Sequence, residues 1–281
     1  MVRRALLIAW VVVLAASGSL EAGQEQPGTQ QVRLRDGSVL FGTVEVSGDD
    51  HIVFRTIGGA EVRIARDSIV SIAPATGDVV AGEFRPADPN ATRLLFAPTG
   101  RALKRGDGYF GVYEFVMPFV QVGLTDRISI GGGTPLLFGL DESERPFWVT
   151  PKVQIVNGRR VQAAAGVMHI VAPEVGSLGI AYGVVTTGRP DASLTVGVGA
   201  GYRRNEGDNG ATTIFMIGGE RGLRSGIKFV TENYIWTGGD GILSGGIRFF
   251  GDRLSADVAL FAPIGIDDLI VLPVVNVVWT F

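Results

Sequence analysis

The side chains that most often carry catalysis or bind metal ions are scarce in this chain. It has two histidines, His51 and His169, and no cysteine in 281 residues. A transition-metal site needs several histidine, cysteine or carboxylate ligands at close spacing, and no His-x-x-x-His pair occurs. The absence of cysteine also excludes disulfides and lipid attachment at an N-terminal cysteine. We therefore expect no catalytic residue, no cofactor site and no metal site, and no enzyme activity.

Two glycine patterns imitate nucleotide-binding motifs without the structural setting that such motifs need. Gly197, Gly199 and Gly201 alternate inside an apolar stretch and open no helix, so they do not form a phosphate-binding turn. Residues 131–133 are all glycine and lie in a predicted strand, where glycine permits bending or the close approach of other side chains. The Arg-Gly-Asp tripeptide at 105–107 is short enough to arise by chance.

The composition argues for a chain with much surface away from water. Charged residues make up 19% of the chain and the mean hydropathy is +0.29, whereas soluble proteins carry about 25% charged residues. The net charge of −3 provides no basic footprint for nucleic acid, which is not an expected partner.

The N-terminus has the layout of a secretory signal peptide. Arg3 and Arg4 precede an apolar run over 5–16, and small residues follow at 17–19. The run is shorter than the roughly 20 residues of a spanning helix. We assign 1–22 to a signal peptide, with cleavage between about residues 18 and 22, and 23–31 to a polar linker.

Residues 32–73 predict a small β-module of five short strands. Its Asp36-Gly37 turn, Gly42 and the closing stretch 69–72 resemble the Sm-like fold. The RNA-binding positions of Sm proteins are not recognisable here, and the module is expected in the periplasm. The resemblance thus implies an adaptor or stabilising domain that contacts periplasmic proteins. A linker with Pro and Gly punctuation follows over 74–91.

The remaining two thirds, 92–281, predict an all-β domain with strands longer than those of soluble sheets. Many candidates have about 9 to 14 residues, as tilted membrane strands do. Twelve candidates are counted, at 92–97, 109–124, 127–138, 147–156, 159–172, 177–187, 192–204, 212–220, 223–235, 242–250, 253–262 and 269–281.

Short and long connections alternate along this domain, as in outer-membrane barrels. Two-residue turns are predicted at Thr125-Asp126, Asn157-Gly158, Arg221-Gly222 and Gly251-Asp252. A short loop at Arg189-Pro190 is predicted to have an odd length, because the apolar residues on both of its sides have even numbers. Longer polar links, such as 98–108, are placed outside. An even strand count returns both chain ends to the periplasmic side.

Apolar faces switch between odd and even numbers across the four two-residue turns, as such turns require. These faces are predicted to point to lipid. They comprise Tyr113, Phe115, Met117, Phe119, Ile128 and Ile130; Val149, Val153, Ile155, Met168 and Ile170; Ile214, Met216, Leu223, Ile227 and Phe229; and Leu243, Ile247, Phe249, Leu254, Ala256, Val258 and Leu260. Ile180, Tyr182, Val184, Leu194, Val196 and Val198 are assigned likewise around Arg189-Pro190.

The last strand, 269–281, alternates apolar and polar residues and ends on an aromatic pair, Trp279 and Phe281. This ending resembles the assembly signal of bacterial outer-membrane β-barrels. The resemblance implies an up-and-down transmembrane barrel of about twelve strands in the bacterial outer membrane, with lipid and the barrel-assembly machinery as partners. A stretch from Arg93 through Val122 to Asp126 also looks like a box of uncharacterised bacterial envelope proteins, and brings no known activity.

The opposite face of the strands carries the charges, which must face a lumen because a lipid-facing Arg or Lys costs about 2 to 4 kcal/mol at mid-membrane. The lumen candidates are Glu114, Arg127, Lys152, Gln154, Arg203, Arg224, Lys228, Glu232, Arg248 and Asp257, with Asn276 beside them. Twelve strands leave a narrow lumen. The surplus of positive candidates predicts a structural barrel or a narrow, anion-leaning passage, with the cargo unidentified.

Two other interpretations stay open from the residues alone. A soluble secreted β-sandwich or barrel would show the same alternation, with its polar face in water. An envelope hydrolase would need a serine and a histidine on the lipid-facing rim, whereas His169 is predicted on the lumen face.

Overall fold

The computed structural model describes residues 28–136, 145–173, 176–189, 191–205, 208–266 and 270–281. The chain divides into two compact units, Met1–Glu83 and Phe84–Phe281, and each is considered by itself. The predicted signal peptide, 1–22, lies outside the described residues. Within them, no helix is long and apolar enough to cross a membrane.

The first unit is a five-stranded antiparallel sheet with the order β4-β3-β2-β1-β5. Val32, Ile52, Phe54 and Ile64 form its core. At the first turn the carboxylate of Asp36 accepts the amide N–H of Ser38 at 2.8 Å, which lowers its pKa. The strands are β1 (Gln30–Leu34), β2 (Val39–Ser47), β3 (His51–Thr56), β4 (Glu61–Ala65) and β5 (Ile69–Pro74), with a 3-10 turn, η1 (Arg66–Ser68), before β5. The five predicted strands are present, and the Sm-like resemblance stays a prediction.

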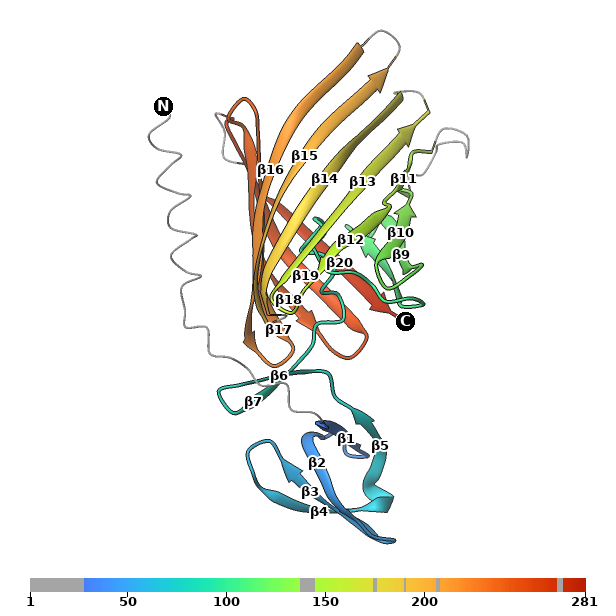
Figure 1. The fold of residues 1–281 in the computed structure, drawn as a ribbon, viewed down its shortest axis with the longest axis vertical. Coiled ribbons are helices and arrows are strands. Elements are labelled where there is room, and N and C mark those ends of the chain that lie inside the picture. The colour runs from blue at the N-terminus through green and yellow to red at the C-terminus, as the bar shows by residue number, and fades with distance from the viewer. Residues whose placement is uncertain (1–27, 137–144, 174–175, 190, 206–207, 267–269) are drawn as a thin grey trace. The chain divides into compact units, whose positions relative to one another are not determined.

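A short hairpin follows, formed by β6 (Gly77–Val80) and β7 (Glu83–Pro86). The second unit then builds one continuous antiparallel sheet (Figure 1). Its strands are β8 (Gly108–Tyr113), β9 (Met117–Gly123), β10 (Ile128–Gly133), β11 (Phe147–Val149), β12 (Lys152–Asn157), β13 (Val161–Ala172), β14 (Gly176–Arg189), β15 (Ala192–Asn205), β16 (Asp208–Arg224), β17 (Ile227–Trp236), β18 (Gly241–Phe250), β19 (Leu254–Ile264) and β20 (Leu272–Thr280).

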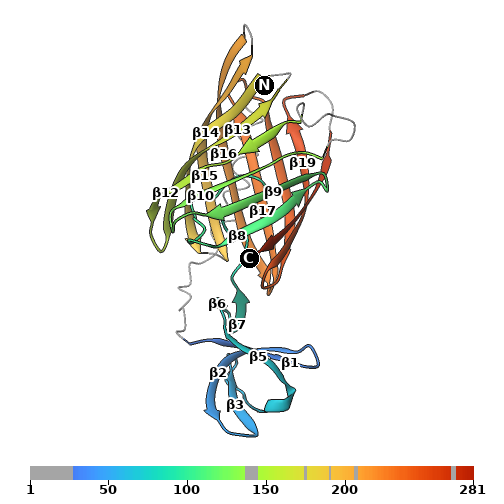
Figure 2. The same cartoon turned by 90° about the vertical axis from the view of Figure 1, so that its right-hand side faces the viewer.

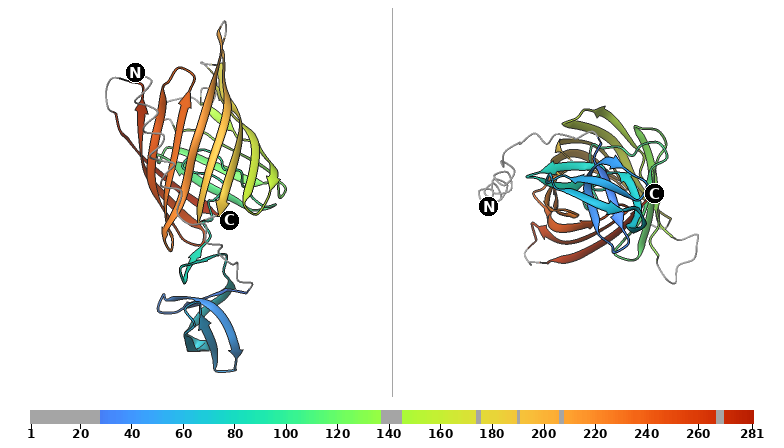
Figure 3. Two further views of the ribbon diagram at one scale, coloured as in Figure 1. Left: turned by 60° about the vertical axis from the view of Figure 1, so that its left-hand side comes forward. Right: turned by 90° about the horizontal axis from the view of Figure 1, so that it is seen from below.

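The sheet closes on itself, because β20 pairs with β8, β8 with β9, and β9 with β10. β11 and β12 together occupy one place in the wall, since both lie between β10 and β13. The wall therefore has twelve places, and the predicted all-β, twelve-stranded antiparallel barrel is confirmed (Figure 3). β14, β15 and β16 rise highest (Figure 1).

The predicted strand 92–97 is wrong, although the total is right. Residues 92–97 lie inside the barrel, and the wall starts at Gly108. The candidate 109–124 is in fact two strands, β8 and β9, joined by a tight turn in which Glu114 and Phe115 have positive φ values of 49° and 61°. One strand too many before Gly108 was thus balanced by one strand too few after it.

Three of the five short connections differ from the prediction. The hairpin β9–β10 has a three-residue turn, since the amide of Thr125 donates to the carbonyl of Ile128. The β16–β17 turn lies at Ser225-Gly226, and Arg221-Gly222 are still in β16. The β14–β15 loop has two residues, because Arg189 pairs with Ala192. The other two connections keep the predicted two-residue length and parity but lie one or two residues later, at 159–160 and 252–253, because the Gly158 amide donates to the Val161 carbonyl and the Gly251 amide to the Leu254 carbonyl.

These differences reverse several predicted faces. β-Bulges at Ile155 and Leu223 add a residue to one strand, which switches the parity of everything beyond them. Side chains assigned to lipid consequently face inward: Tyr113, Phe119, Met168, Ile170, Tyr182, Val184 and Met216. Val153, Leu194, Val196, Val198, Phe229, Phe249, Val258 and Leu260 are exposed on the outside, as predicted.

The outer surface of the barrel is apolar all round. Large aliphatic and aromatic side chains stand exposed on most of its strands, including Phe110, Val120, Val185, Phe215 and Trp279 at 41–52%. Monomeric soluble proteins seldom expose contiguous apolar surface of this extent. A closed antiparallel sheet with such a surface satisfies its backbone inside lipid. This arrangement excludes the soluble interpretation, in which the apolar faces would lie inside.

Candidate functional site

The lumen contains a stretch of the chain itself, residues 88–101, which we call the plug segment. It folds into a tight hairpin, since the Leu94 amide donates to the Ala97 carbonyl at 2.8 Å and the Thr99 amide to the Thr92 carbonyl at 3.0 Å. Arg93 and Pro98 form the bridge between its two arms. Leu94 and Leu95 at its tip are fully buried. The apolar run that imitated a strand is thus the tip of an internal hairpin.

Arg248 on β18 joins the plug segment to the wall. Its guanidinium is fully buried and binds Asp257 of β19 through two contacts, at 2.6 and 3.1 Å. The same group donates to the Asp88 carboxylate at 2.9 Å. It also donates to the backbone carbonyls of Asn90, Arg93 and Leu94. The planar, multiply donating guanidinium suits such a junction of carboxylates and carbonyls.

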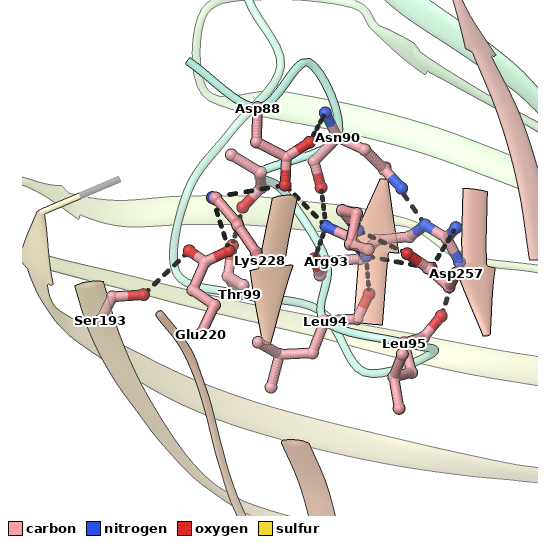
Figure 4. Close-up of polar contacts among 12 residues, drawn as sticks. Asp88, Asn90, Arg93, Leu94, Leu95, Thr99, Ser193, Glu220, Lys228 and Asp257 are labelled. Atoms are coloured by element: carbon pink, nitrogen blue, oxygen red, sulfur yellow. Dashed lines mark hydrogen bonds and ion pairs between the residues drawn. The ribbon is translucent and has the colours of Figure 1, made fainter. Parts of the chain in front are cut away.

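A second charged group lies beside it. Lys228 of β17 is 3.0 Å from Glu220 of β16 and 3.4 Å from Asp88 (Figure 4). Glu220 also binds the Arg101 guanidinium and accepts a hydrogen bond from Ser193. Both ends of the plug segment are therefore tied by ion pairs to the wall. Charges buried in this way are tolerable because each has a partner.

Hydrogen bonds between the plug segment and Glu232, Lys152 and Asn276 complete its attachment to the wall. Glu232 accepts the amides of Phe96 and Ala97 at 2.9 and 2.8 Å. On the other side, Lys152 of β12 donates to the carbonyls of residues 92, 99 and 101. Asn276 of β20 binds the Leu95 carbonyl at 3.2 Å. The plug segment is thus bonded to strands on opposite sides of the wall.

An apolar core surrounds the plug tip. Leu94, Leu95 and Ala97 pack against inward side chains of the wall, which include Val184, Met216, Val230, Phe261 and Val274. Gly218 makes room for the tip, because a methyl group in place of its hydrogen would lie 2.5 Å from Leu94 Cδ1. This core explains why Tyr182, Val184 and Met216 face inward despite being apolar.

The predicted lumen residues fall into two groups. Deep in the barrel, and 0–7% exposed, are Lys152, Gln154, Lys228, Glu232, Arg248, Asp257 and Asn276, all of which touch or neighbour the plug segment. Glu114, Arg127, Arg203 and Arg224 lie instead in turns or near strand ends, and the last three are exposed. The side chain of Glu114 accepts the Val275 amide. Whether any of these residues lines a passage stays a prediction.

Sequence reasoning missed the plug residues and Glu220. Asp88 and Asn90 fell in the predicted linker, and Arg93 and Arg101 in the predicted first strand and its loop. Glu220 could have revealed the error. The predicted turn at Arg221-Gly222 places Glu220 on the same face as Met216, toward lipid. A carboxylate is unfavourable on a lipid-facing surface, so Glu220 argues against that turn.

His169 lies on the outer face of β13, which corrects its predicted lumen position. Its Nδ1 is 2.7 Å from the Tyr202 hydroxyl, and the two rings stack across Gly179. No serine is hydrogen-bonded to it in the described part of the chain. Likewise, no group of three or more potential metal ligands occurs within the described ranges.

No family model and no curated protein matches the chain. Among solved structures, it is similar to the KdgM porin, with 7% identity and a TM-score of 0.47 over 62% of this chain and 98% of that one. The NanC porin shows 9% identity and 0.44 over 62% and 98%. A loop-deletion mutant of OmpT, an outer membrane protein of Vibrio cholerae, shows 11% and 0.38 over 90% and 96%. By its own geometry, the second unit is a twelve-stranded β-barrel of the outer-membrane type.

Proposed function

We propose that this protein is an outer-membrane barrel that its own plug segment closes at rest, and that any passage through it is narrow and opens only when the plug moves. The observation that carries the proposal is the Arg248 junction. One fully buried guanidinium binds the wall through Asp257 and the plug through Asp88 and three carbonyls. A segment held in this way occupies the space that an open pore would need.

The charges of the lumen bear on selectivity. The wall carries three deep cations, Lys152, Lys228 and Arg248. It also carries three deep carboxylates, Glu220, Glu232 and Asp257, so that its buried charges balance. The plug segment adds Arg93 and Arg101 against Asp88. A preference for anions, which the sequence predicts, would thus depend on the plug remaining in the lumen.

The location follows from the apolar outer surface. We place the barrel in a bacterial outer membrane, with Trp279 and Phe281 as the signal read by the assembly machinery. Both side chains are at least half exposed on the outer face, and the Phe281 amide pairs with the Gly108 carbonyl at the seam where the last strand meets the first. The sheet at 32–73 is proposed to lie in the periplasm and to contact proteins there.

Planar-bilayer recording tests the closed state. The native protein is expected to show little or no conductance, and Arg248→Ala is expected to show frequent openings, because the plug loses its largest polar attachment. Arg224→Ala removes an exposed arginine from the same barrel and should behave like the native protein. A large, steady conductance of the native protein would contradict the proposal.

Reversal potentials in a salt gradient test selectivity. In openings of the double variant Arg248→Met/Asp257→Asn, which removes one cation and one carboxylate together, anions should be favoured while the plug is partly in place, whereas complete displacement should leave little preference. A clear preference for cations would contradict the charge inventory of the lumen.

A further inference from the structure

A cavity lies beside the plug segment and is lined mainly by aromatic and aliphatic side chains. Its volume is about 260 Å³. Phe96, Tyr113 and Phe119 form one side, where the Tyr113 and Phe119 rings stack at 4.1 Å. Trp148 of β11 and Met168 and Ile170 of β13 also line the cavity. Small-molecule pockets are lined in this way by hydrophobic and aromatic side chains with a few polar groups, and their usual volumes begin at about 300 Å³, just above that of this cavity.

The charged side chains that line this cavity are both cations. Arg93 lies over the Tyr113 and Phe119 rings, at 5.0 and 5.2 Å, and shares its charge with Asp257 at 3.6 Å. Lys152 is 7% exposed and contacts backbone carbonyls alone, with no carboxylate within 4.0 Å in the described residues. Among the described residues, no acidic side chain lines the cavity. An anionic group is therefore the complementary charge at this end.

The wall beside the cavity is low. β8, β9 and β10 have 6, 7 and 6 residues, whereas β14, β15 and β16 have 14, 14 and 17 (Figure 2). A strand needs about 9 to 11 residues to cross the hydrocarbon core. Within the described residues, β8, β9 and β10 therefore span less of that depth than β14, β15 and β16 do. β20 continues past its last pair with β8, so that residues 272–274 form an edge, where Pro273 has no N–H to leave unpaired.

The rim of this low wall is apolar. Phe115 and Val116 in the β8–β9 turn are 71% and 41% exposed, and Leu136, whose amide binds the Val116 carbonyl, is 47% exposed. Met117, the next residue after the turn, lines the cavity. Exposed apolar side chains thus lie at the rim, one residue away from a side chain that lines the cavity.

We propose that this cavity binds a long-chain fatty acid that enters from the membrane over the low wall. The carboxylate would lie beside Lys152 and Arg93, and the hydrocarbon chain would run between the Phe119 and Trp148 sides toward Met117. The glycines at 131–133 belong to this site, because side chains at Gly131 and Gly133 would collide with Gln121 and with the Trp148 ring. The proposal is independent of gating, since a permanently closed barrel could bind the acid equally well.

Quenching of Trp148 by a fatty acid brominated on its chain tests the proposal. The probe is added to the full-length protein in detergent, in a variant with Trp10→Phe, Trp236→Phe and Trp279→Phe, in which Trp148 is the remaining tryptophan. Saturable quenching that the unbrominated acid reverses is expected. A matched variant that keeps Trp279 on the outer face, with Trp10→Phe, Trp148→Phe and Trp236→Phe, reports partitioning into detergent and should show unsaturable quenching. Unsaturable quenching of Trp148 as well would overturn the proposal.

Neighbouring substitutions separate the cavity from the outer wall. Met168→Phe enlarges a lining side chain and should weaken binding about tenfold. Val167→Phe makes a similar change one residue earlier, on the outer face of the same strand, and should leave binding unchanged. Equal effects of the two variants would place the ligand on the outside of the barrel and overturn the proposed site.

The anionic end is tested with matched ligands. Lys152→Met should weaken binding of the fatty acid about tenfold but not that of the fatty alcohol of equal length. Retained alcohol binding shows that the variant is folded, and Lys152→Arg should restore binding of the acid. If the native protein binds acid and alcohol equally, the assignment of the carboxylate to Lys152 is wrong.

Discussion

At the scale of single residues, the lumen is held by charges that would be intolerable without each other. Arg248, Asp257 and Asp88 are almost fully buried, and each is paired. Removing one member of such a group leaves an uncompensated charge, which typically costs about 3 to 5 kcal/mol. The plug segment is therefore an integral part of the barrel, because without it several wall charges would lose their partners.

Gly218→Val is predicted to displace the plug tip and to strain the wall, because its Cβ would lie 2.5 Å from both Leu94 Cδ1 and the Thr231 carbonyl oxygen of β17. Overpacking of a filled core costs about 1 to 3 kcal/mol, so the free energy of unfolding in urea should fall by this amount and bilayer conductance should rise. Gly245→Val is the control, since a methyl group there would meet Phe229 at an ordinary 3.4 Å. A Gly218→Val protein with native stability and native conductance would show that the lumen is not packed as described.

At the scale of elements, side chains repair a gap in the β17–β18 ladder. Regular pairing stops at Val230 and resumes at Tyr234. Between them, the Ser244 hydroxyl accepts the Glu232 amide at 3.0 Å and donates to the Glu232 carbonyl. The Asn233 side chain accepts the Ser244 amide at 2.9 Å. The gap lies at Glu232, the residue that holds the amides of the plug tip.

Ser244→Ala is predicted to loosen this part of the wall. The Glu232 amide and carbonyl would be left without partners, at a cost of about 1 to 3 kcal/mol. Amide hydrogen exchange, followed by mass spectrometry, should accelerate in the peptide that contains Glu232 and in the plug segment. Exchange should be unchanged in β14, and uniform acceleration throughout the barrel would argue against a local role.

The elements also show how far the sequence leads. Alternation correctly placed the outward faces of β18, β19 and β20, because no bulge interrupts the pairing of β19 with its two neighbours and the parity is preserved. It failed where a bulge at Leu223 or a three-residue turn after Leu124 changed the count. The short apolar run with Leu94 and Leu95 predicts a strand, because its periodicity does not distinguish a strand of the wall from a segment buried inside the barrel. The ion pairs of the plug join residues far apart in sequence, so spacing alone gave no sign of them.

At the scale of the whole molecule, the question is whether the outer surface of the barrel faces lipid or water. Val258→Arg on β19 is predicted to lower the free energy of unfolding from lipid by about 2 to 4 kcal/mol, because its side chain faces the hydrocarbon core. Val46→Arg in the first sheet should change it little. The two valines are 52% and 55% exposed, so their surroundings rather than their exposure make the difference. Similar effects in the two variants would contradict a lipid-facing surface.

The plug also dictates an order of events during synthesis and insertion. Asn276 meets Leu95 across 181 positions of sequence, and Arg248 meets Asp88 across 160. Contacts of such long range form slowly, since a long loop must close before they contribute. The first segment of the barrel to leave the ribosome must therefore wait for the last strand before its partners exist. Until that moment its arginines and carboxylates need water or a chaperone, and the seam between β20 and β8 can seal only once they have been gathered inside.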